Sequence, residues 1–379
     1  MSSPLLERLR AARLHAQRTP ADLDALVRGS LALHSTDYWS PYLSAWARIP
    51  DFNPTDLRSR LNEGRGLVRL NCLRNTVHVV HTADLPLLLA ATGAAVGSVG
   101  RRGPGLKGLS EPAVRRGLDA LCGALADGPL GVNELKAARP ELAADLRSWL
   151  MVAMGEGLIL RADAAHARSN RTRYALTGAW VKGFQPSDLP AGEARRQLLV
   201  SALRAFGPIT VADLAWWLPA PKGEVQRALA SLGPRVQTLD AEGETWHFDA
   251  ELPDREAPPR EQAGAWLLPY EDGLLKAYLD RSWLMAPGLR DVIFPFSVSH
   301  WRPPDGVSPG PGPHKGVNVS GEARPSVWWG GRVVGRWEEA PTGPVWQLHA
   351  DVGAEAGDAI KREVQRLRRF LVEDLAPLS

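Results

Sequence analysis

The chain has 379 residues, a net charge of +3 and a hydrophobic content of 44%. This length exceeds one ordinary core and predicts two to four modules, and the composition is that of a globular protein rather than a disordered one. The basic residues are mostly arginine, whose planar guanidinium suits phosphate, although a GC-rich genome produces the same bias. Arginine content alone therefore does not identify a partner.

Three features exclude other classes of protein. No stretch approaches the roughly 18 apolar residues that a membrane-spanning helix needs. The N-terminal segment carries Glu7 and Arg8 within its apolar periodicity, so we interpret it as an amphipathic helix rather than a signal peptide. Cys72 and Cys122 are the only cysteines, which excludes a disulfide framework and a cysteine-based zinc site. We expect a cytoplasmic protein without a cofactor.

Helical and β patterns alternate in a fixed order over the first hundred residues. Apolar residues at helical spacing predict helices, and β-prone runs around a polar centre predict a hairpin. The predicted elements are helices over residues 4–17, 20–33, from 41 onwards and 54–61, a hairpin over 67–80, and a helix from 82 to 89. Three helices followed by a two-stranded wing predict a winged helix.

A glycine-rich stretch over residues 93–109 contains Arg101, Arg102 and Lys107. Its composition predicts a loop or a linker. Basic glycine segments contact phosphate backbones in some proteins and are simply mobile in others, so both roles stay open. Arg101 and Arg102 are candidate nucleic-acid contacts.

The helix and hairpin pattern then occurs twice more. The second copy is predicted from a helix over 111–126, the first half of a helix-turn-helix at 130–135, a recognition-type helix over 145–155, and strands 158–161 and 173–176 that flank a polar tip at 162–172. Its wing carries Arg161, His166, Arg168, Arg171 and Arg173. Alternating arginines on a hairpin suit the DNA backbone or minor groove, and a solvated hairpin is the alternative.

The third copy and the C-terminal part complete the predicted fold. The third copy has helices over 195–205, 211–217 and 222–232 and a hairpin over 236–239 and 245–248. A proline-rich linker over 253–260 leads to short strands at 266–269, 292–298, 317–319, 326–329, 333–337 and 345–349, a Pro/Gly-rich loop at 303–316 and a closing helix at 355–371. Such strands suggest a small barrel or curled sheet. We therefore expect an α+β protein with three tandem winged helices and a small C-terminal barrel-like domain, divided as 1–109, 110–190, 191–255 and 256–379.

Four polar residues, His34, Ser35, Thr36 and Asp37, stand together between two apolar helical patterns. Side chains of this kind do not fill a core, so they form either a helix cap or a site. Asp37 is a favoured N-cap residue, as is Ser40, and the next residue is a proline suited to the first helical turn. His34 is equally compatible with an ordinary, partly buried histidine. The chemistry alone leaves both interpretations open.

The sequence resembles the winged-helix DNA glycosylases of the AlkZ/YcaQ type. The resemblance begins at LALHSTDYWSPYLSAWARI (31–49), where the polar Gln-x-Gln or Gln-x-Asp motif of that family falls on His34 and Thr36. It continues through LVRLNCLRNTVHVVHTADL (67–85), LLPYEDGLLKAYLDRS (267–282) and VVGRW (333–337). The Arg-Gly-Thr-x-His-like strand of the family falls on Arg74, Asn75, Thr76 and His78, with asparagine where glycine is usual.

The resemblance implies a monofunctional DNA glycosylase that acts on double-stranded DNA bearing alkylated purines. The substrates of the family are bulky N7-guanine adducts and interstrand crosslinks, and some members protect antibiotic producers from their own DNA-alkylating product. An N7-alkylated guanine is already cationic and leaves without protonation, so the enzyme must position a water and accept its proton. We expect His34 to act as positioner or base, Asp37 as base or electrostatic stabiliser, and Thr36 as support, in a monomer.

The basic residues singled out above and the strand motif at 74–78 are the expected DNA contacts. We expect them from Arg74, Asn75, Thr76 and His78, and from Arg101, Arg102, Arg161, Arg168, Arg171 and Arg173. The competing hypotheses are a non-enzymatic DNA-binding protein, either a regulator or one that shelters alkylated DNA, and a winged-helix protein that binds another protein. Salt-dependent affinity for duplex DNA and release of free base distinguish the three.

Two further groups of residues are candidate sites, one for a metal ion and one of acidic side chains. His78 and His81 lie three apart on a predicted strand, hence on opposite faces, which argues against a metal pair. An acidic site could be formed by Glu271, Asp272, Asp280 and Arg281, but helix caps and salt bridges are the favoured interpretation. No glycine-rich dinucleotide motif after a strand and no P-loop is present.

Overall fold

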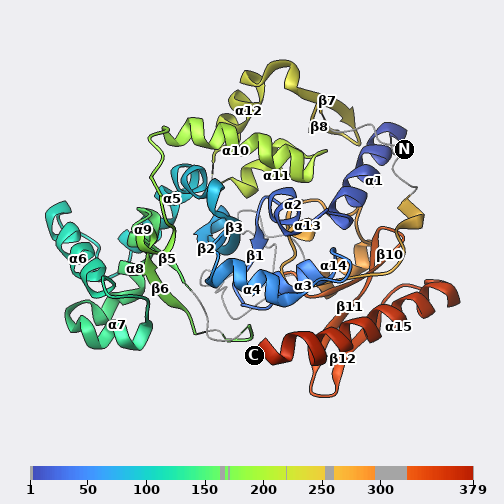
Figure 1. The fold of residues 1–379 in the computed structure, drawn as a ribbon. Helices are drawn as coiled ribbons and strands as arrows, with labels where there is room; N and C mark the ends of the chain where they lie inside the picture. Colours follow the sequence, from blue (N-terminus) through green and yellow to red (C-terminus); the bar gives the residue numbers. More distant parts are fainter. Residues whose placement is uncertain are drawn as a thin grey trace, which may run out of the picture.

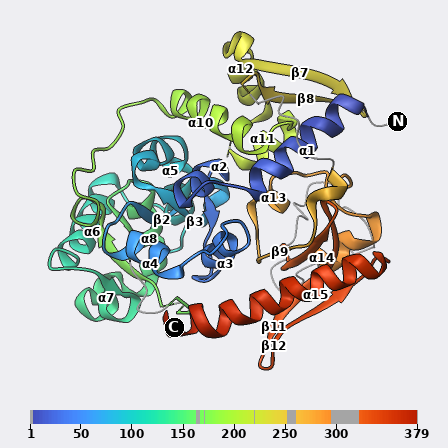
Figure 2. The same ribbon diagram turned by 45° about the vertical axis from the view of Figure 1, so that its right-hand side comes forward.

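The computed structural model describes residues 3–162, 167–169, 171–218, 220–251, 260–294 and 322–378. In these residues the strands form a six-stranded antiparallel sheet, a four-stranded antiparallel sheet and a two-stranded hairpin. The N-terminal elements lie at the centre, with helices α6 to α8 on one side and the C-terminal sheet on the other (Figures 1 and 2). The molecule is therefore a mixed helix and sheet protein with antiparallel sheets, as the sequence predicts.

The N-terminal part has the predicted order of helices and strands, with one short strand added. Its elements are α1 (Pro4–Arg18), α2 (Leu23–Gly29), β1 (Leu33–His34), α3 (Ser40–Trp46), α4 (Pro54–Asn62), β2 (Leu67–Cys72) and β3 (Thr76–His81). The predicted helix over 20–33 ends at Gly29, because Leu31 has a φ of 63° and the chain then turns into β1. Strand β1 pairs with β3, and β3 pairs with β2.

The second part repeats this order. Its elements are α5 (Leu85–Arg101), α6 (Glu111–Ala124), β4 (Leu130–Gly131), α7 (Val132–Ala138), α8 (Leu146–Gly155), β5 (Ile159–Arg161), β6 (Arg173–Leu176) and α9 (Thr177–Trp180). Strand β4 pairs with β6, and β6 with β5. A single pair, Arg69 opposite Arg161, joins β2 to β5. The two parts therefore share one sheet in the order β1-β3-β2-β5-β6-β4.

The loop predicted at 93–109 is wrong over its first half, because α5 continues to Arg101. The glycines allow α5 to approach α8 at backbone distance: a Cβ on Gly93 would lie 2.3 Å from the carbonyl oxygen of Gly155, and one on Gly100 would lie 2.3 Å from that of Ser148. The segment Thr82–Arg101 is also long and apolar enough to cross a membrane, but 44% of it is buried inside the protein. These glycines therefore reflect close helix packing rather than chain flexibility.

The third repeat consists of α10 (Ala191–Phe206), α11 (Val211–Trp217), α12 (Lys222–Ser231), β7 (Val236–Ala241) and β8 (Glu244–Asp249). Ile209 forms a bridge with His247 on β8, at the place where the first two repeats have a short strand. Helix α12 exposes Lys222, Gln226 and Arg227. The helix at the same position in the second repeat, α8, is instead buried over most of its length against α5.

The C-terminal part contains β9 (Trp266–Leu268), α13 (Gly273–Lys276), α14 (Arg290–Ile293), β10 (Ser326–Trp329), β11 (Arg332–Ala340), β12 (Gly343–Leu348) and α15 (Gly353–Arg369). The described strands have the open order β12-β11-β10-β9, so the barrel-like closure stays a prediction. The strand predicted at 292–298 is wrong at its start, which is helical. Most of the linker, the rest of that strand, the strand at 317–319 and the loop at 303–316 lie outside the described residues.

Two hydrophobic cores hold these parts together. One core combines side chains of the first repeat, the third repeat and the C-terminal sheet. The other is formed within the second repeat, mainly by α6 and α8. The predicted boundaries at 109, 190 and 255 remain predictions. The first of these cores places the N-terminal part against residues more than 200 positions later in the chain. The candidate site lies where these two parts meet.

Candidate active site

The polar cluster lies on β1 and the loop that follows it, at the edge of the six-stranded sheet. His34 pairs with His78, which in turn pairs with Leu70. The neighbouring row, one residue along each strand, contains Leu33 and Arg69. Because side chains alternate along a strand, these two rows point to opposite faces of the sheet. The cluster therefore divides between the two faces.

His34 is buried and lies in an electropositive environment. Its side chain makes edge-to-face contacts with His78 and Tyr270, with both ring centroids 5.8 Å away, and the residue is 8% exposed. Its Nε2 atom is buried without a hydrogen-bond partner among the described residues. Burial, reinforced by the positive charges of Lys276 and Arg74, lowers the pKa of His34 to about 3. The imidazole is therefore neutral at neutral pH, with one ring nitrogen unused.

Asp37 lies just before α3, whose N-cap position is Trp39, and its carboxylate binds the first helical residue, Ser40. The backbone N–H of Ser40 donates to Asp37 Oδ1 at 2.6 Å, and the Ser40 hydroxyl donates to Oδ2 at 2.8 Å. Burial raises the pKa of the Asp37 carboxyl, against the lowering effect of the Ser40 hydrogen bonds. Thr36 lies between His34 and Asp37 and is exposed. A carboxylate oxygen has more than one lone pair, so the cap does not use up its capacity as a base.

A segment far away in the sequence completes the surroundings of His34. Lys276 donates to Glu271 at 2.9 Å, and both residues are buried. Burial lowers the pKa of Lys276 to about 8, while the negative charge of Glu271 acts in the opposite direction. Glu271 has a φ of 56° and accepts a hydrogen bond from the backbone N–H of Ala323 at 2.5 Å. Of this pair, Lys276 is the member whose charge acts on His34, and Tyr270 contacts the histidine ring.

The interpretation of this acidic segment as caps and salt bridges is confirmed. Asp272 accepts from the backbone of Leu274 and forms a buried ion pair with Arg48 at 2.8 Å. The nearby Asp280 accepts from the backbone of Ser282. The sequence did not reveal that Tyr270, in the same segment, contacts the histidine. The only available signal was that this segment and the polar cluster both match one family.

The tip of the β2–β3 hairpin carries Arg74 and Asn75 in left-handed backbone conformations, with φ values of 53° and 61°. The Arg74 guanidinium lies over the ring of Trp216, 4.0 Å from its centroid. The hydroxyl of Thr76 donates to a backbone carbonyl within the turn. His78, expected to contact DNA, is only 3% exposed and packs against His34. The strand alternation that brings His78 to the site also withdraws it from the surface, and we do not retain it as a DNA contact.

The other predicted DNA contacts fall into two groups. The first group is already paired within the protein. Arg101 forms ion pairs with Glu111 and Glu156, and Arg168 forms one with Glu339. Arg161 donates to Asn71 and Thr172, and Arg173 donates to the carbonyl of Pro129. The second group, Arg102 and Arg171, is exposed. His166 lies outside the described residues. The arginines of the β5–β6 hairpin are therefore spread along its length rather than gathered around His34.

The described residues contain no cluster of three or more histidine, cysteine or acidic side chains able to hold a metal ion. His78 and His81 point to opposite faces of β3, as their spacing predicts. His78 meets His34, whereas His81 contacts Arg28 and Asp24. The chemistry available at the site is therefore that of a neutral imidazole, a carboxylate and a buried ion pair.

Comparison with known proteins covers almost the whole chain. The model of the DNA glycosylase AlkZ-like family matches residues 27–370. The Streptomyces sahachiroi DNA glycosylase AlkZ has a similar solved structure, with a TM-score of 0.75 and 19% identity over 97% of each chain. At this identity the structural match supports the fold. No curated protein matches the chain in sequence. The chain belongs to the AlkZ-like family of DNA glycosylases.

Proposed function

We propose that this protein is a monofunctional glycosylase for bulky N7-alkylguanine in duplex DNA, including natural-product adducts or interstrand crosslinks. The observation that carries the proposal is the placement of His34 three residues before a carboxylate whose pKa is raised by burial, with the histidine Nε2 buried and unpartnered among the residues that the structure describes. Buried polar atoms normally have partners, so an unused one at a family motif supports a role in binding a reactant.

The proposed reaction is attack of a water on C1′ of the deoxyribose. The C1′–N9 bond breaks, its electron pair neutralises the cationic base, and Asp37 takes the proton of the water. The neutral His34 orients that water through Nε2, and the exposed Thr36 supports it. A pKa of about 3 makes His34 a weak base, which favours Asp37 in that role. The negative charge of Asp37 also stabilises the oxocarbenium-like transition state.

The repeated fold supports duplex DNA as the partner. Three repeats have helices followed by a hairpin, with a short strand or bridge paired to the hairpin, and we interpret each as a winged helix. In the third repeat, α12 exposes Lys222 and Arg227, so this helix is available to a groove or to phosphates. We further propose a cytoplasmic monomer that acts in base-excision repair, with self-resistance of an antibiotic producer as its setting.

One observation favours the alternative of a non-enzymatic protein that shelters alkylated DNA. Both carboxylate oxygens of Asp37 already accept hydrogen bonds from Ser40. A residue that serves only as a cap would show the same geometry. The two functions differ in whether the glycosidic bond is broken.

The test is single-turnover excision of N7-methylguanine, and then of a bulky N7 adduct, from duplex DNA. Release of the modified base by the wild-type protein, and its loss in His34→Ala and Asp37→Ala variants that still bind DNA, would establish the proposal. A faster rate on the bulky adduct would assign the substrate class. Binding without release of either base would favour the sheltering function, and wild-type rates in both variants would reject the site.

A further inference from the structure

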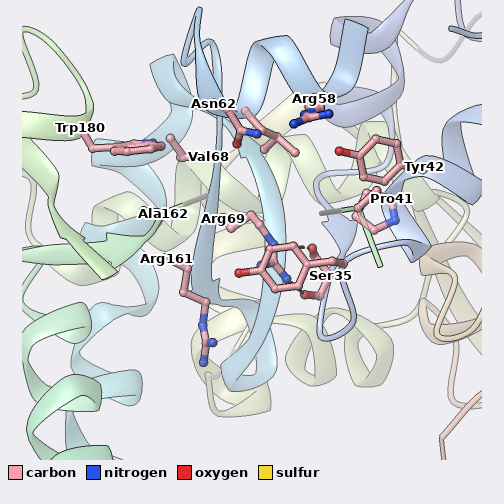
Figure 3. Close-up of a pocket in the computed structure, with 13 residues that line it drawn as sticks. Ser35, Pro41, Tyr42, Arg58, Asn62, Val68, Arg69, Arg161, Ala162 and Trp180 are labelled. Carbon is pink, nitrogen blue, oxygen red and sulfur yellow. Dashed lines mark hydrogen bonds between the residues drawn. The ribbon is translucent and has the colours of Figure 1, made fainter. Parts of the chain in front are cut away.

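The loop that carries the candidate motif is held from behind the sheet by one arginine. Arg69 lies on β2, and its Nε atom donates to the Ser35 hydroxyl at 2.8 Å. Its Nη2 atom donates to the backbone carbonyl of the same serine. Ser35 is the residue between His34 and Thr36, so both hydrogen bonds reach the centre of the motif (Figure 3).

The guanidinium contacts the loop at a further point, although its third nitrogen, Nη1, is buried without a hydrogen-bond partner among the described residues. It lies over the ring of Tyr38, 3.2 Å from the centroid, so it contacts the loop again three residues beyond Ser35. The backbone N–H of Ser35 is fixed by the carbonyl of Val77 on β3. Arg69 is 4% exposed, and burial lowers its pKa to about 10, which leaves it charged at neutral pH. Arg69 thus spans the part of the loop that contains Thr36 and Asp37.

We propose that Arg69 is the positioning residue of the active-site loop, fixing His34 and Asp37 from the opposite face of the sheet. This inference rests on the proposed function. It assigns to Arg69 no contact with DNA, because its guanidinium is buried against Ser35 and Tyr38. Two donors in one rigid plane fix both the distance and the rotation of the Ser35 peptide, which the single point charge of a lysine does not.

The expected consequence concerns rate rather than affinity. A displacement of about 1 Å of catalytic groups costs on the order of 10²-fold in rate. We expect Arg69→Lys and Arg69→Ala to bind alkylated duplex DNA with wild-type affinity and wild-type salt dependence, while single-turnover excision falls about 10²-fold. Ser35→Ala should lose less, because the hydrogen bond to its backbone carbonyl remains.

The matched control is Arg13→Lys. Arg13 is as buried as Arg69, burial lowers its pKa also to about 10, and its Nε donates to the carbonyl of Gly207 at 2.9 Å. It is not part of the motif loop, so its loss reports the cost of disturbing a buried arginine in general. We expect this variant to retain the excision rate of the wild type after correction for the folded fraction.

Chemical rescue distinguishes positioning from packing. Free guanidinium or methylguanidinium at millimolar concentration, too dilute to denature, should restore part of the excision rate of Arg69→Ala, whereas methylammonium should not. The inference is overturned if Arg69→Lys and Arg13→Lys lose rate equally, or if Arg69→Ala weakens DNA binding with a changed salt slope. A wild-type protein that releases no base would instead contradict the proposed function.

Discussion

The two faces of the β1–β3–β2 sheet differ although adjacent residues supply them. On one face, His34 has a ring nitrogen without a partner in the described part of the chain, beside Tyr270 and Lys276. On the other, Ser35 is bound through both its hydroxyl and its carbonyl by Arg69. One step along a strand reverses the face, so a short motif can divide reactive and supporting groups between two environments. The His34 face should therefore determine the chemical step and the acid sensitivity of folding stability. The Ser35 face should determine how precisely the motif loop is positioned.

The largest effect is expected from Asp37→Asn, in the loop that follows β1. The amide still accepts from the backbone of Ser40, but it cannot take a proton from water. Removal of a general base typically costs 10²- to 10⁴-fold, so we expect single-turnover excision to fall by about that factor while DNA affinity is unchanged. Because burial raises the pKa of Asp37, the wild-type rate should rise with pH until this carboxyl is ionised, and the variant should lose that rise.

Ser40→Ala is the control for the cap. It removes the hydroxyl that bonds Asp37 Oδ2 at 2.8 Å and keeps the backbone donor to Oδ1. We expect a modest loss of stability, about 1 kcal/mol, with most of the excision rate retained. If Asp37→Asn retained full rate, or Ser40→Ala lost as much rate as Asp37→Asn, then Asp37 would be a cap without a chemical role.

An intermediate effect is expected on stability in acid. His34 has a pKa of about 3 in the folded protein and about 6.5 when unfolded, so between these values the unfolded chain binds more protons. The contribution of His34 to folding stability is therefore fully present above pH 6.5. This contribution falls as the pH drops, by up to about 1.4 kcal/mol per pH unit. His78, whose pKa burial also lowers, adds to the same trend.

His34→Gln removes this titration while keeping a polar side chain of similar reach. Urea unfolding at pH 6.5 and at pH 4.5 should show that the variant loses less stability than the wild type, by on the order of 2 kcal/mol. An equal loss in both proteins would mean that His34 is solvated in the folded state. That result would mean that the environment of His34 does not differ from solvent, and the proposed difference between the two faces of the sheet would be lost.

Local patterns predicted the repeated helices and hairpins because amphipathic spacing and β-prone runs are properties of a few consecutive residues. The same local reasoning failed at residues 93–101, where glycines serve the contact of α5 with Gly155 on α8. That contact depends on a partner more than 50 residues away. Glycine composition alone does not distinguish it from a loop.

The candidate site was predicted in part for a similar reason. His34, Thr36 and Asp37 were identified from one short stretch and its family resemblance, and their roles remain proposals. The surroundings that set the pKa of His34 come from Tyr270 and Lys276, joined to it only by the shared core. Arg69 was not recognised because a single arginine in a strand carries no signal of what it binds.

The smallest effect is expected at the far end of the sheet. The pairing of Arg69 with Arg161 continues the Ser35 face onto β5, which with β6 forms the hairpin that carries the predicted DNA contacts. Arg168→Ala combined with Arg171→Ala should weaken DNA binding at low salt by several-fold. It should also make the slope of log affinity against log salt shallower by up to about 2, since each lost phosphate contact removes about 0.9. Excision of bound substrate should keep its wild-type rate.

Arg101→Ala provides the comparison, because Arg101 is paired with two carboxylates, those of Glu111 and Glu156, whereas Arg168 is paired with Glu339 alone and Arg171 is exposed. Its salt slope should change less than that of the double variant. A double variant with unchanged binding would remove the β5–β6 hairpin from the interface. A loss of excision rate without loss of affinity would show that this hairpin acts on the motif loop through the Ser35 face. The supporting role of that face would then extend from β2 to β5 and β6.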